Sequence, residues 1–308
     1  MSADLQAPAF TNETAAREAI EAVLWPDGPV CPRCGSLDHI GKVSGKSARP
    51  GLYYCGECKR QFTVTVGTIF ERSKVPLSKW WLAIHLMASS KKGMSAHQLH
   101  RSLGVTYQTA WFVEHRIREA MRSGSLAPMG GTGGIVEADE TFIGRKEGTI
   151  RRRGHGHKNA VLSLVDRNSG QVRSFHVEGT SAADIVPIIK ANVAKETAMM
   201  TDEGGHYFTL GDHFASHESV SHKADEYVRG EVHTNTVEGY YSVFKRGMKG
   251  VYQHCGEKHL HRYLAEFDFR YSNRTRLGVE DTERAAKVVL GAKGKRLMYR
   301  RPYEGSAL

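Results

Sequence analysis

Residues 135–144 read IVEADETFIG, and apolar and polar side chains alternate along this stretch. A period of two is typical of a strand, and it predicts that Glu137, Asp139 and Thr141 lie on one face while Glu140 lies on the other. An acid in the middle of a strand is costly unless a cation lies against it. The stretch therefore predicts a core strand that also carries part of a charged site.

The residues that follow continue this pattern. Residues 159–179, NAVLSLVDRNSGQVRSFHVEG, predict two strands joined by a turn at residues 168–170. Residues 181–196 predict a helix with Ser181 at its N-cap, and residues 198–203, AMMTDE, predict a further strand that ends on an acid. Strands that alternate with helices indicate an α/β layer with a sheet at its centre.

A third acid lies in residues 233–246, HTNTVEGYYSVFKR, which have a helical pattern. Glu238 and Lys245 are seven residues apart and share a helix face, which Asn235 also shares. Two strand carboxylates and one helical carboxylate can hold a pair of divalent ions for phosphoryl transfer. Each acid also has a plainer interpretation, as a surface charge (Glu137 or Glu140), a turn residue (Asp202) or half of a solvated helix pair (Glu238).

Towards the N-terminus, residues 123–134, SGSLAPMGGTGG, have the composition of a flexible joint. Before this joint, the spacing of Trp80, Ile84 and Met87 predicts an amphipathic helix. A second helix is predicted over residues 95–103, Gly104 breaks the chain, and Thr106 caps a third helix that runs to about residue 121.

This helix, glycine turn and helix are typical of a helix-turn-helix, whose second helix reads the DNA major groove. An ordinary three-helix cluster with a solvated basic face fits the pattern as well, and the positive charge of the chain favours DNA. The pattern places the following side chains on the outside of the third helix: Tyr107, Gln108, Thr109, His115, Arg116 and Arg118.

Cysteine spacing predicts a metal site near the N-terminus. Cys31 and Cys34 form one CxxC pair, and Cys55 and Cys58 form a second pair after 20 intervening residues. Each pair presents two thiolates from a tight turn, and the intervening length suffices for a β-hairpin that brings the pairs together around zinc. Four protein ligands leave no open position, so we expect a structural Zn²⁺ site rather than a catalytic one.

Composition narrows the class of protein. The chain has 308 residues, with 43 Lys and Arg against 33 Asp and Glu, so its formal charge is +10. A basic surplus favours polyanionic partners. No apolar run approaches the roughly 18 residues of a membrane span, and the first residues lack the pattern of a secretory signal. We therefore expect a cytoplasmic, nucleoid-associated protein that is not bound to membranes.

These motifs, taken in order, resemble the DDE transposases of bacterial insertion sequences, in particular the ISXO-like group with an N-terminal zinc ribbon. The resemblance rests on CPRCG and CGEC, FTVTVGTIFERSKVPLSKWW, VEADETFIG, TDE, HTNTVEG, FKRG and YLAEFDFRYSNR, and it covers nearly the whole chain. It implies an α/β fold in which an RNase H-like catalytic domain follows a zinc ribbon and a helix-turn-helix.

The resemblance also implies the site residues. The catalytic acids are Asp139, Asp202 and Glu238, with Asn235 as the alternative third residue, and they bind two Mg²⁺ ions, for which Mn²⁺ can substitute. The implied partners are double-stranded DNA, both transposon ends and target, and further copies of the chain in a homo-oligomer on DNA. Lys245 contacts the transposon end in that family, and the expected DNA-binding residues are Lys245, Arg246, Tyr107, Gln108, Thr109, Arg116, Arg151, Arg152 and Arg153.

The predicted domains are an N-terminal helix (1–25), a zinc ribbon (26–66), a helix-turn-helix region (67–124), a Gly-rich linker (125–134), the catalytic domain (135–285) and a basic tail (286–308). The predicted function is transposase, which binds terminal inverted repeats and catalyses Mg-dependent strand cleavage and strand transfer. Two alternatives stay open: an inactive or domesticated DNA-binding regulator, and an RNase H-like nuclease that cuts without joining.

Some residues fit less specific interpretations. Residues 145–158 hold six Lys or Arg against one acid, and residues 287–301 hold six more with no acid, so both are candidate contacts to the DNA backbone or solvated surface. Cys255 is expected to be a small buried hydrophobe. A second metal site is a weaker interpretation of the histidines His213, His217, His222 and His233.

Overall fold

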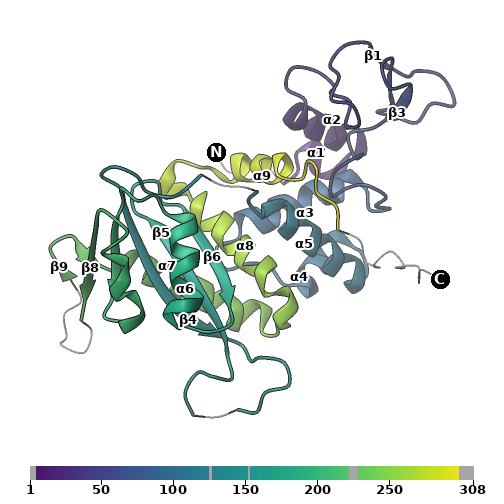
Figure 1. The fold of residues 1–308 in the computed structure, drawn as a ribbon. Coiled ribbons are helices and arrows are strands. Elements are labelled where there is room, and N and C mark those ends of the chain that lie inside the picture. Colours follow the sequence, from purple (N-terminus) through teal and green to yellow (C-terminus); the bar gives the residue numbers. More distant parts are fainter. Residues whose placement is uncertain (1–4, 125–126, 152, 222–227, 298–308) are drawn as a thin grey trace, which may run out of the picture. The chain divides into compact units, whose positions relative to one another are not determined.

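The computed structural model describes residues 5–124, 127–151, 153–221 and 228–297 (Figure 1). It divides into two compact units. The helical unit comprises the described parts of residues 1–90, 94–122 and 279–308, and the sheet unit comprises those of residues 91–93 and 123–278.

The helical unit contains a small three-stranded sheet and six helices among its described residues. Its elements are α1 (Pro8–Thr11), α2 (Glu13–Leu24), β1 (Ile40–Lys42), β2 (Tyr53–Cys55), β3 (Arg60–Phe62), α3 (Leu77–Ser89), α4 (Ala96–Leu103), α5 (Tyr107–Met121) and α9 (Asp281–Leu290). Strand β2 pairs antiparallel with both β1 and β3. The β-hairpin predicted between the two cysteine pairs is confirmed.

Helices α4 and α5 begin and end where the sequence predicts. Ser95 and Gln98 form a capping box at the start of α4, and Gly104 ends it in the left-handed region at φ 60°. The Thr106 hydroxyl then accepts a hydrogen bond from the Thr109 N–H, 3.3 Å away, at the start of α5. The two helices of the predicted pattern are confirmed as helices.

Helix α9 departs from the predicted domain limits. The sequence pattern assigns residues 281–285 to the catalytic domain and residues 286–290 to the basic tail. The structure instead groups α9 with the helical unit, where it contacts α2, α3 and α5. Its apolar stripe of Ala285, Val288 and Val289 is buried, which gives the physical reason for the difference.

The sheet unit alternates strands and helices as predicted. Its elements are β4 (Ile135–Ile143), β5 (Asn159–Asp166), β6 (Val172–Val177), α6 (Ala182–Asn192), β7 (Ala198–Asp202), η1 (Gly205–Leu210), β8 (Ser216–Val220), β9 (Val228–Arg229), β10 (Val232–His233), α7 (Asn235–Gly247), η3 (Met248–Tyr252), η4 (Glu257–His259), α8 (Leu260–Ser272) and η5 (Thr275–Leu277). Ser181 caps α6 as predicted.

Five of these strands form one mixed sheet in the order β6-β5-β4-β7-β8. Strands β4, β5 and β6 form an antiparallel meander, while β7 is parallel to both β4 and β8. An antiparallel meander extended on one side by parallel crossover strands is the arrangement of the RNase H-like fold, so the predicted fold class is confirmed for this unit.

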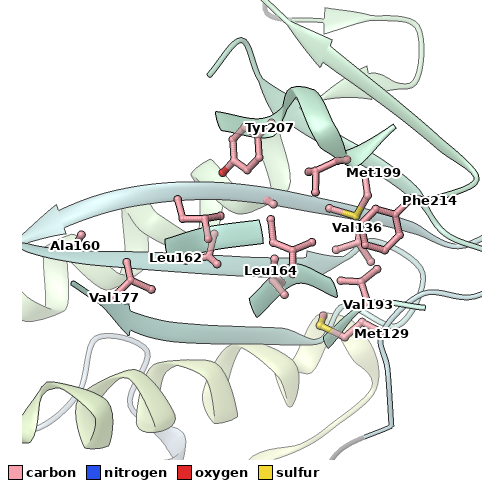
Figure 2. Close-up of a cluster of buried hydrophobic side chains, with 14 residues drawn as sticks. Met129, Val136, Ala160, Leu162, Leu164, Val177, Val193, Met199, Tyr207 and Phe214 are labelled. Carbon is pink, nitrogen blue, oxygen red and sulfur yellow. The ribbon is translucent and has the colours of Figure 1, made fainter. Parts of the chain in front are cut away.

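The two faces of the sheet bury different clusters. On one face, inward side chains of β4, β5 and β7 pack with residues of α6 and η1, and Figure 2 shows this cluster, which includes Val136, Leu162, Met199 and Tyr207. On the other face, α7 and α8 cover a second cluster that includes Val161 and Phe244. Glu137 and Asp139 point to this second face, which α7 covers.

The predicted Gly-rich linker is only partly a joint. Residues 125–126 lie outside the described residues, but Met129 is buried in the core of the sheet unit. Its N–H donates to the Asn192 carbonyl (2.8 Å), and the Gly131 N–H donates to the Thr197 hydroxyl (2.8 Å). Residues 129–134 therefore belong to the sheet unit and lead directly into β4.

Among the described residues, no helix has the length and apolar character needed to cross a bilayer.

Candidate active site

Two of the predicted catalytic acids lie at equivalent positions on neighbouring parallel strands. In the pairing of β4 with β7, Ile135 lies opposite Ala198 and Glu137 opposite Met200. Continued by two residues, this register sets Asp139 beside Asp202. Because side chains at equivalent positions of parallel strands point to the same face, both carboxylates face the side that α7 covers.

Helix α7 carries the predicted third acid, Glu238, and Lys245. Its buried stripe, which includes Val237, Tyr241 and Phe244, packs on the sheet, so Glu238 and Lys245 occupy another side of the helix. The Tyr241 hydroxyl donates to the Asp139 carbonyl oxygen (2.5 Å) and ties the helix to β4 next to the acid.

Glu238 and Asn235 both lie in the first turn of α7. The Glu238 carboxylate accepts a hydrogen bond from the Thr234 hydroxyl (3.1 Å), and Asn235 is exposed at the first helical position. The negative charges of Glu238 and Asp202 both act on Asp139. Glu238 is therefore electrostatically coupled to Asp139, and the choice between Glu238 and Asn235 as the third residue stays a prediction.

The electrostatics of Asp139 are those of a cation site. The pKa of its carboxyl is raised to about 8, first by burial and then by the negative charges of Glu140, Asp202 and Glu238. Burial lowers the pKa of Lys245, and the negative charge of Asp139 partly offsets this by raising it. Hard carboxylate oxygens that repel one another fit Mg²⁺ or Mn²⁺, because a divalent cation offsets the repulsion.

The three carboxylates are not in close contact with one another. Within the described residues, one set of three or more Cys, His, Asp or Glu ligand atoms lies within 4.8 Å of one another, and it consists of the four cysteines. Two ions about 3.5 to 4 Å apart are held by a wider set of oxygens than a single ion is.

A neighbouring acid, Glu137, anchors the catalytic helix. Its side chain is fully buried, and its carboxylate accepts hydrogen bonds from the backbone N–H groups of Thr236 and Val237, each at 2.8 Å. Arg167 donates to the same carboxylate at 2.6 Å and also reaches the His233 carbonyl. A carboxylate at a helix N-terminus is favourable, and here it joins β4 to α7.

Glu140, on the opposite face of β4, is also held in place. Its Oε1 accepts a hydrogen bond from the Tyr207 hydroxyl (2.5 Å) and lies 2.9 Å from His206 Nε2. Burial raises the pKa of Glu140, whereas Tyr207 and His206 lower it. The plainer interpretation of Glu137 and Glu140 as surface charges was wrong, because both side chains are buried with partners.

Gly204 lets the chain turn closely around Asp202. Its N–H donates to Asp202 Oδ1 (2.9 Å). A Cβ at this position would lie 2.9 Å from Asp202 Oδ1 and 2.7 Å from Cε1 of His206, closer than real Cβ contacts. Any larger residue would force the His206 ring or the Asp202 carboxylate at the end of β7 to move.

The four cysteines of the CxxC pairs form a compact metal site in the helical unit. Their sulfur atoms lie within 4.8 Å of one another, with Cys31 and Cys58 at 3.7 Å and Cys34 and Cys55 at 3.6 Å. Tetrahedral zinc with Zn–S bonds of about 2.3 Å requires sulfurs about 3.75 Å apart. The residues fit a structural Zn²⁺ ion with four protein ligands.

The predicted recognition helix, α5, presents fewer polar side chains than expected. Tyr107 and Gln108 are exposed and Thr109 is half-buried, as a DNA-reading N-terminus requires. Arg116 is buried and donates to the carbonyl oxygens of Ile69 (2.6 Å) and of Glu71 and Leu297 (both 3.1 Å). Its expected outward orientation, and that of His115 and Arg118, was wrong.

The remaining candidate DNA contacts belong to the sheet unit. Arg151, Arg153 and Arg246 are exposed, and Arg152 lies outside the described residues. Lys245 is half-buried, with its ammonium 5.7 Å from the centre of the Tyr241 ring. The exposure of Arg151, Arg153 and Arg246 is what a contact to the DNA backbone would require.

The histidines do not form a second metal site among the described residues. His217 Nε2 lies 2.9 Å from the Thr201 hydroxyl, and His233 Nδ1 lies 2.9 Å from the Arg167 guanidinium. His222 lies outside the described residues. Cys255 packs at the edge of the cluster under α7 and α8, but it is only partly buried, whereas a buried side chain was expected.

The sheet order, with two acids in register and a third on the covering helix, defines a domain of the RNase H-like class. Residues 132–272 match the ISXO2-like transposase domain, and residues 11–61 match the transposase zinc-ribbon domain. The chain therefore carries the domains of an insertion-sequence transposase of the ISXO2-like family, as the sequence motifs indicated.

Two further similarities accompany these matches. The chain is 28% identical over 277 residues to an uncharacterized protein in transposable element ISH50 from Halobacterium salinarum, covering 85% of this chain and 91% of the relative. A chain of the cryoEM structure of the simian T-cell lymphotropic virus intasome in complex with PP2A regulatory subunit B56 gamma is 15% identical, with a TM-score of 0.30. That match covers 55% of this chain and 63% of the viral one, less than two thirds of its length.

Sequence reasoning missed the anchoring role of Glu137. Alternation along residues 135–144 placed it on the face of Asp139, but its partners, Arg167 and the N–H groups of Thr236 and Val237, lie far along the chain. The sequence did contain one signal for this role. A charged acid in a central strand is costly to bury, so Glu137 required a partner of opposite charge or hydrogen-bond donors.

Proposed function

We propose that this protein is a DNA transposase that binds the terminal inverted repeats of its element, cleaves the strand at each end and joins that end to target DNA. The observation that carries the proposal is the register of Asp139 and Asp202 on adjacent parallel strands, with the charge of Glu238 acting on the same site. The transposase domain and zinc-ribbon matches support the same conclusion.

The carboxylates of Asp139, Asp202 and Glu238 would hold two Mg²⁺ ions, with Mn²⁺ as a substitute. When bound, these ions would activate the attacking oxygen and stabilise the leaving oxygen of a phosphodiester. The negative charge of the three side chains provides the binding energy, and the partial burial of Asp139 excludes competing water from its side of the site.

The protein's other side chains would bind and orient the DNA. Lys245 lies in the field of Asp139, so its ammonium is suited to contact a phosphate next to the scissile bond. Glu137 and the Tyr241 hydroxyl fix α7 against β4 and thereby set the separation of Glu238 from the other two acids. Attack in line by water, and then by the freed 3′-hydroxyl, requires no covalent enzyme intermediate.

The helical unit would select the DNA. Tyr107 and Gln108, together with Thr109, lie at the N-terminal end of α5, the end that reads base edges in a helix-turn-helix. Arg151, Arg153 and Arg246 would contact the phosphate backbone in the sheet unit. Since two ends are processed together, we propose that the protein acts as a homo-oligomer on DNA.

The test incubates the zinc-loaded protein with Mg²⁺, duplexes that carry the element's own terminal repeats and a second duplex as target. We expect cleaved ends and joined products from wild type, and neither from Asp139→Asn. The matched control is Asp212→Asn, because Asp212 is an exposed acid of the same unit outside the acidic set.

Pre-cleaved ends separate the alternatives. Joining of pre-cleaved ends into the second duplex supports transposition. Cleavage without joining would indicate an RNase H-like nuclease, and sequence-specific binding without either reaction would indicate a DNA-binding regulator. Cleavage or joining that survives Asp139→Asn would contradict the assignment of the site.

A further inference from the structure

The loop between β4 and β5 contains a basic hollow that lies outside the acidic site. The hollow has a volume of about 530 Å³ and is lined by Arg151, Arg153, Gly154, His157 and Lys158. Among the described residues, no acidic side chain lines it. Such a lining is suited to an anion with several oxygens.

Hydrogen bonds hold the base of this loop in place. The Lys146 N–H donates to the His157 carbonyl (2.9 Å), and the Thr149 hydroxyl donates to the Lys146 carbonyl (2.7 Å). The Lys158 N–H donates to the His155 carbonyl (2.8 Å), and the His155 ring stacks on Phe142 with centroids 4.6 Å apart. The lining residues therefore rise from a base that the chain itself positions.

His157 gives the hollow an unsatisfied polar atom. The side chain is 9% exposed, and within the described residues its Nδ1 has no hydrogen-bond partner. A buried donor or acceptor without a partner is costly and uncommon in native proteins. Burial lowers the pKa of His157, and the positive charges of Lys158 and Arg151 lower it further. A negative charge in the hollow would offset the positive charges that lower this pKa.

The hollow is electrostatically continuous with the acidic site. The charge of Lys158 lowers the pKa of Lys245, whose own pKa Asp139 raises. Lys158 lines the hollow, so its charge couples the hollow to Lys245, which is coupled in turn to Asp139.

We propose that the hollow binds a backbone phosphate of the DNA strand that passes through the active site, with the His157 imidazole at its wall. This inference rests on the proposed function, because it takes the strand held by the acids as its ligand. Arg151, Arg153 and Lys158 neutralise the phosphate, and Gly154, at φ 87°, keeps the rim open where a side chain would be strained.

The test observes His157 directly. Zinc-loaded, histidine-labelled protein is titrated, without divalent cation, with inorganic phosphate and separately with a short duplex that lacks the terminal repeats. The His157 ring signals are assigned with the His157→Gln variant. We expect them to shift with the duplex at concentrations at which inorganic phosphate leaves them unchanged. A shift with inorganic phosphate alone, or no shift with either probe, would overturn the proposal.

A matched pair of charge variants provides a second measurement. Arg153→Gln removes a cation of the hollow, whereas Arg145→Gln removes an exposed cation of the same loop that does not line it. We expect Arg153→Gln to reduce the slope of log affinity against log salt by about 0.9, the loss of one phosphate contact, and Arg145→Gln to change it by less. Equal effects would overturn the proposal.

Both measurements record binding without cleavage, so their result is separate from that of the proposed function. Cleavage and joining with no His157 shift would refute the hollow alone. A His157 shift in a protein that neither cleaves nor joins would refute the transposase and leave a phosphate site for nucleic acid.

Discussion

The cysteine site and the proposed carboxylate site differ in how the chain brings their side chains together. The four cysteines come from two short turns joined by one hairpin, and their sulfurs lie within 4.8 Å of one another. The acids come from two strands and a helix, and they repel one another enough to help raise the pKa of Asp139 to about 8. Thiols lose their protons as zinc binds, whereas acids gathered without a cation gain protons or stand apart.

Local spacing therefore suffices to form the cysteine site, whereas the carboxylate site depends on the fold of the whole sheet unit. The zinc ligands need only their own hairpin. The acids need the β4–β7 register and the anchoring of α7 by Glu137. Disturbing the zinc site should therefore affect local folding, and disturbing the acids should affect chemistry.

Zinc removal is expected to have the largest effect. Structural zinc contributes roughly 10 to 16 kcal/mol of apparent binding free energy in small zinc modules. Cys58→Ser, or a strong chelator, should therefore unfold the ribbon around β1–β3. The measurement is zinc content together with hydrogen exchange of residues 40–62, and Cys255→Ser is the matched control. Persistent protection of the ribbon amides without zinc would contradict the account.

Glu238→Gln should reduce strand cleavage by about 10³-fold, because loss of a metal-binding charge costs several kcal/mol of transition-state stabilisation. Asn235→Ala should retain most of the activity, since a neutral amide binds a divalent cation more weakly than a carboxylate does. Cleavage rates at saturating Mg²⁺ compare the two variants. The reverse ranking would move the third catalytic role to Asn235.

Glu137→Ala should destabilise the sheet unit by about 3 kcal/mol. It leaves Arg167 without its buried carboxylate and α7 without the acceptor at its N-terminus. Chemical denaturation measures the effect, and Glu231→Ala is a suitable control because Glu231 is exposed. An unchanged midpoint would mean that Glu137 does not hold the helix.

The last expected effect is a pH dependence of the stability that comes from Asp268. Burial raises the pKa of this carboxyl to about 7, although it accepts hydrogen bonds from Tyr240 and Ser174. Because the folded state keeps a proton that the unfolded state releases at about pH 4, stability should fall as pH rises from about 4 to about 7. The slope for one proton is at most about 1.4 kcal/mol per pH unit. Denaturation of Asp268→Asn across this range should show a shallower slope, and an identical slope would refute the assignment.

Local signals predicted most of the elements. The strand of residues 135–143 follows from alternation, α5 from the Thr106 cap and the zinc site from two CxxC pairs. These features depend on residues that are close in sequence, so their pattern is visible in one segment.

The errors arose where distant segments meet. Arg116 looked solvent-facing because its partners, the carbonyls of Ile69, Glu71 and Leu297, are remote in sequence. Helix α9 looked like the start of a tail because the helices that cover its apolar stripe precede it by more than 150 residues. Of the candidate site, the acids were predicted from their motifs, but the anchoring of α7 by Glu137 required the fold.

The central claim is that Asp139, Asp202 and Glu238 jointly bind two divalent ions, and Mn²⁺ titration followed by electron paramagnetic resonance tests it most directly. Zinc-loaded wild type bound to end-containing duplex should bind two Mn²⁺ ions with the spectrum of a coupled pair, and Asp139→Asn, Asp202→Asn and Glu238→Gln should each abolish that signal. A coupled pair that survives any of the three substitutions, or wild type that binds no Mn²⁺ beyond the DNA's own, would contradict the claim.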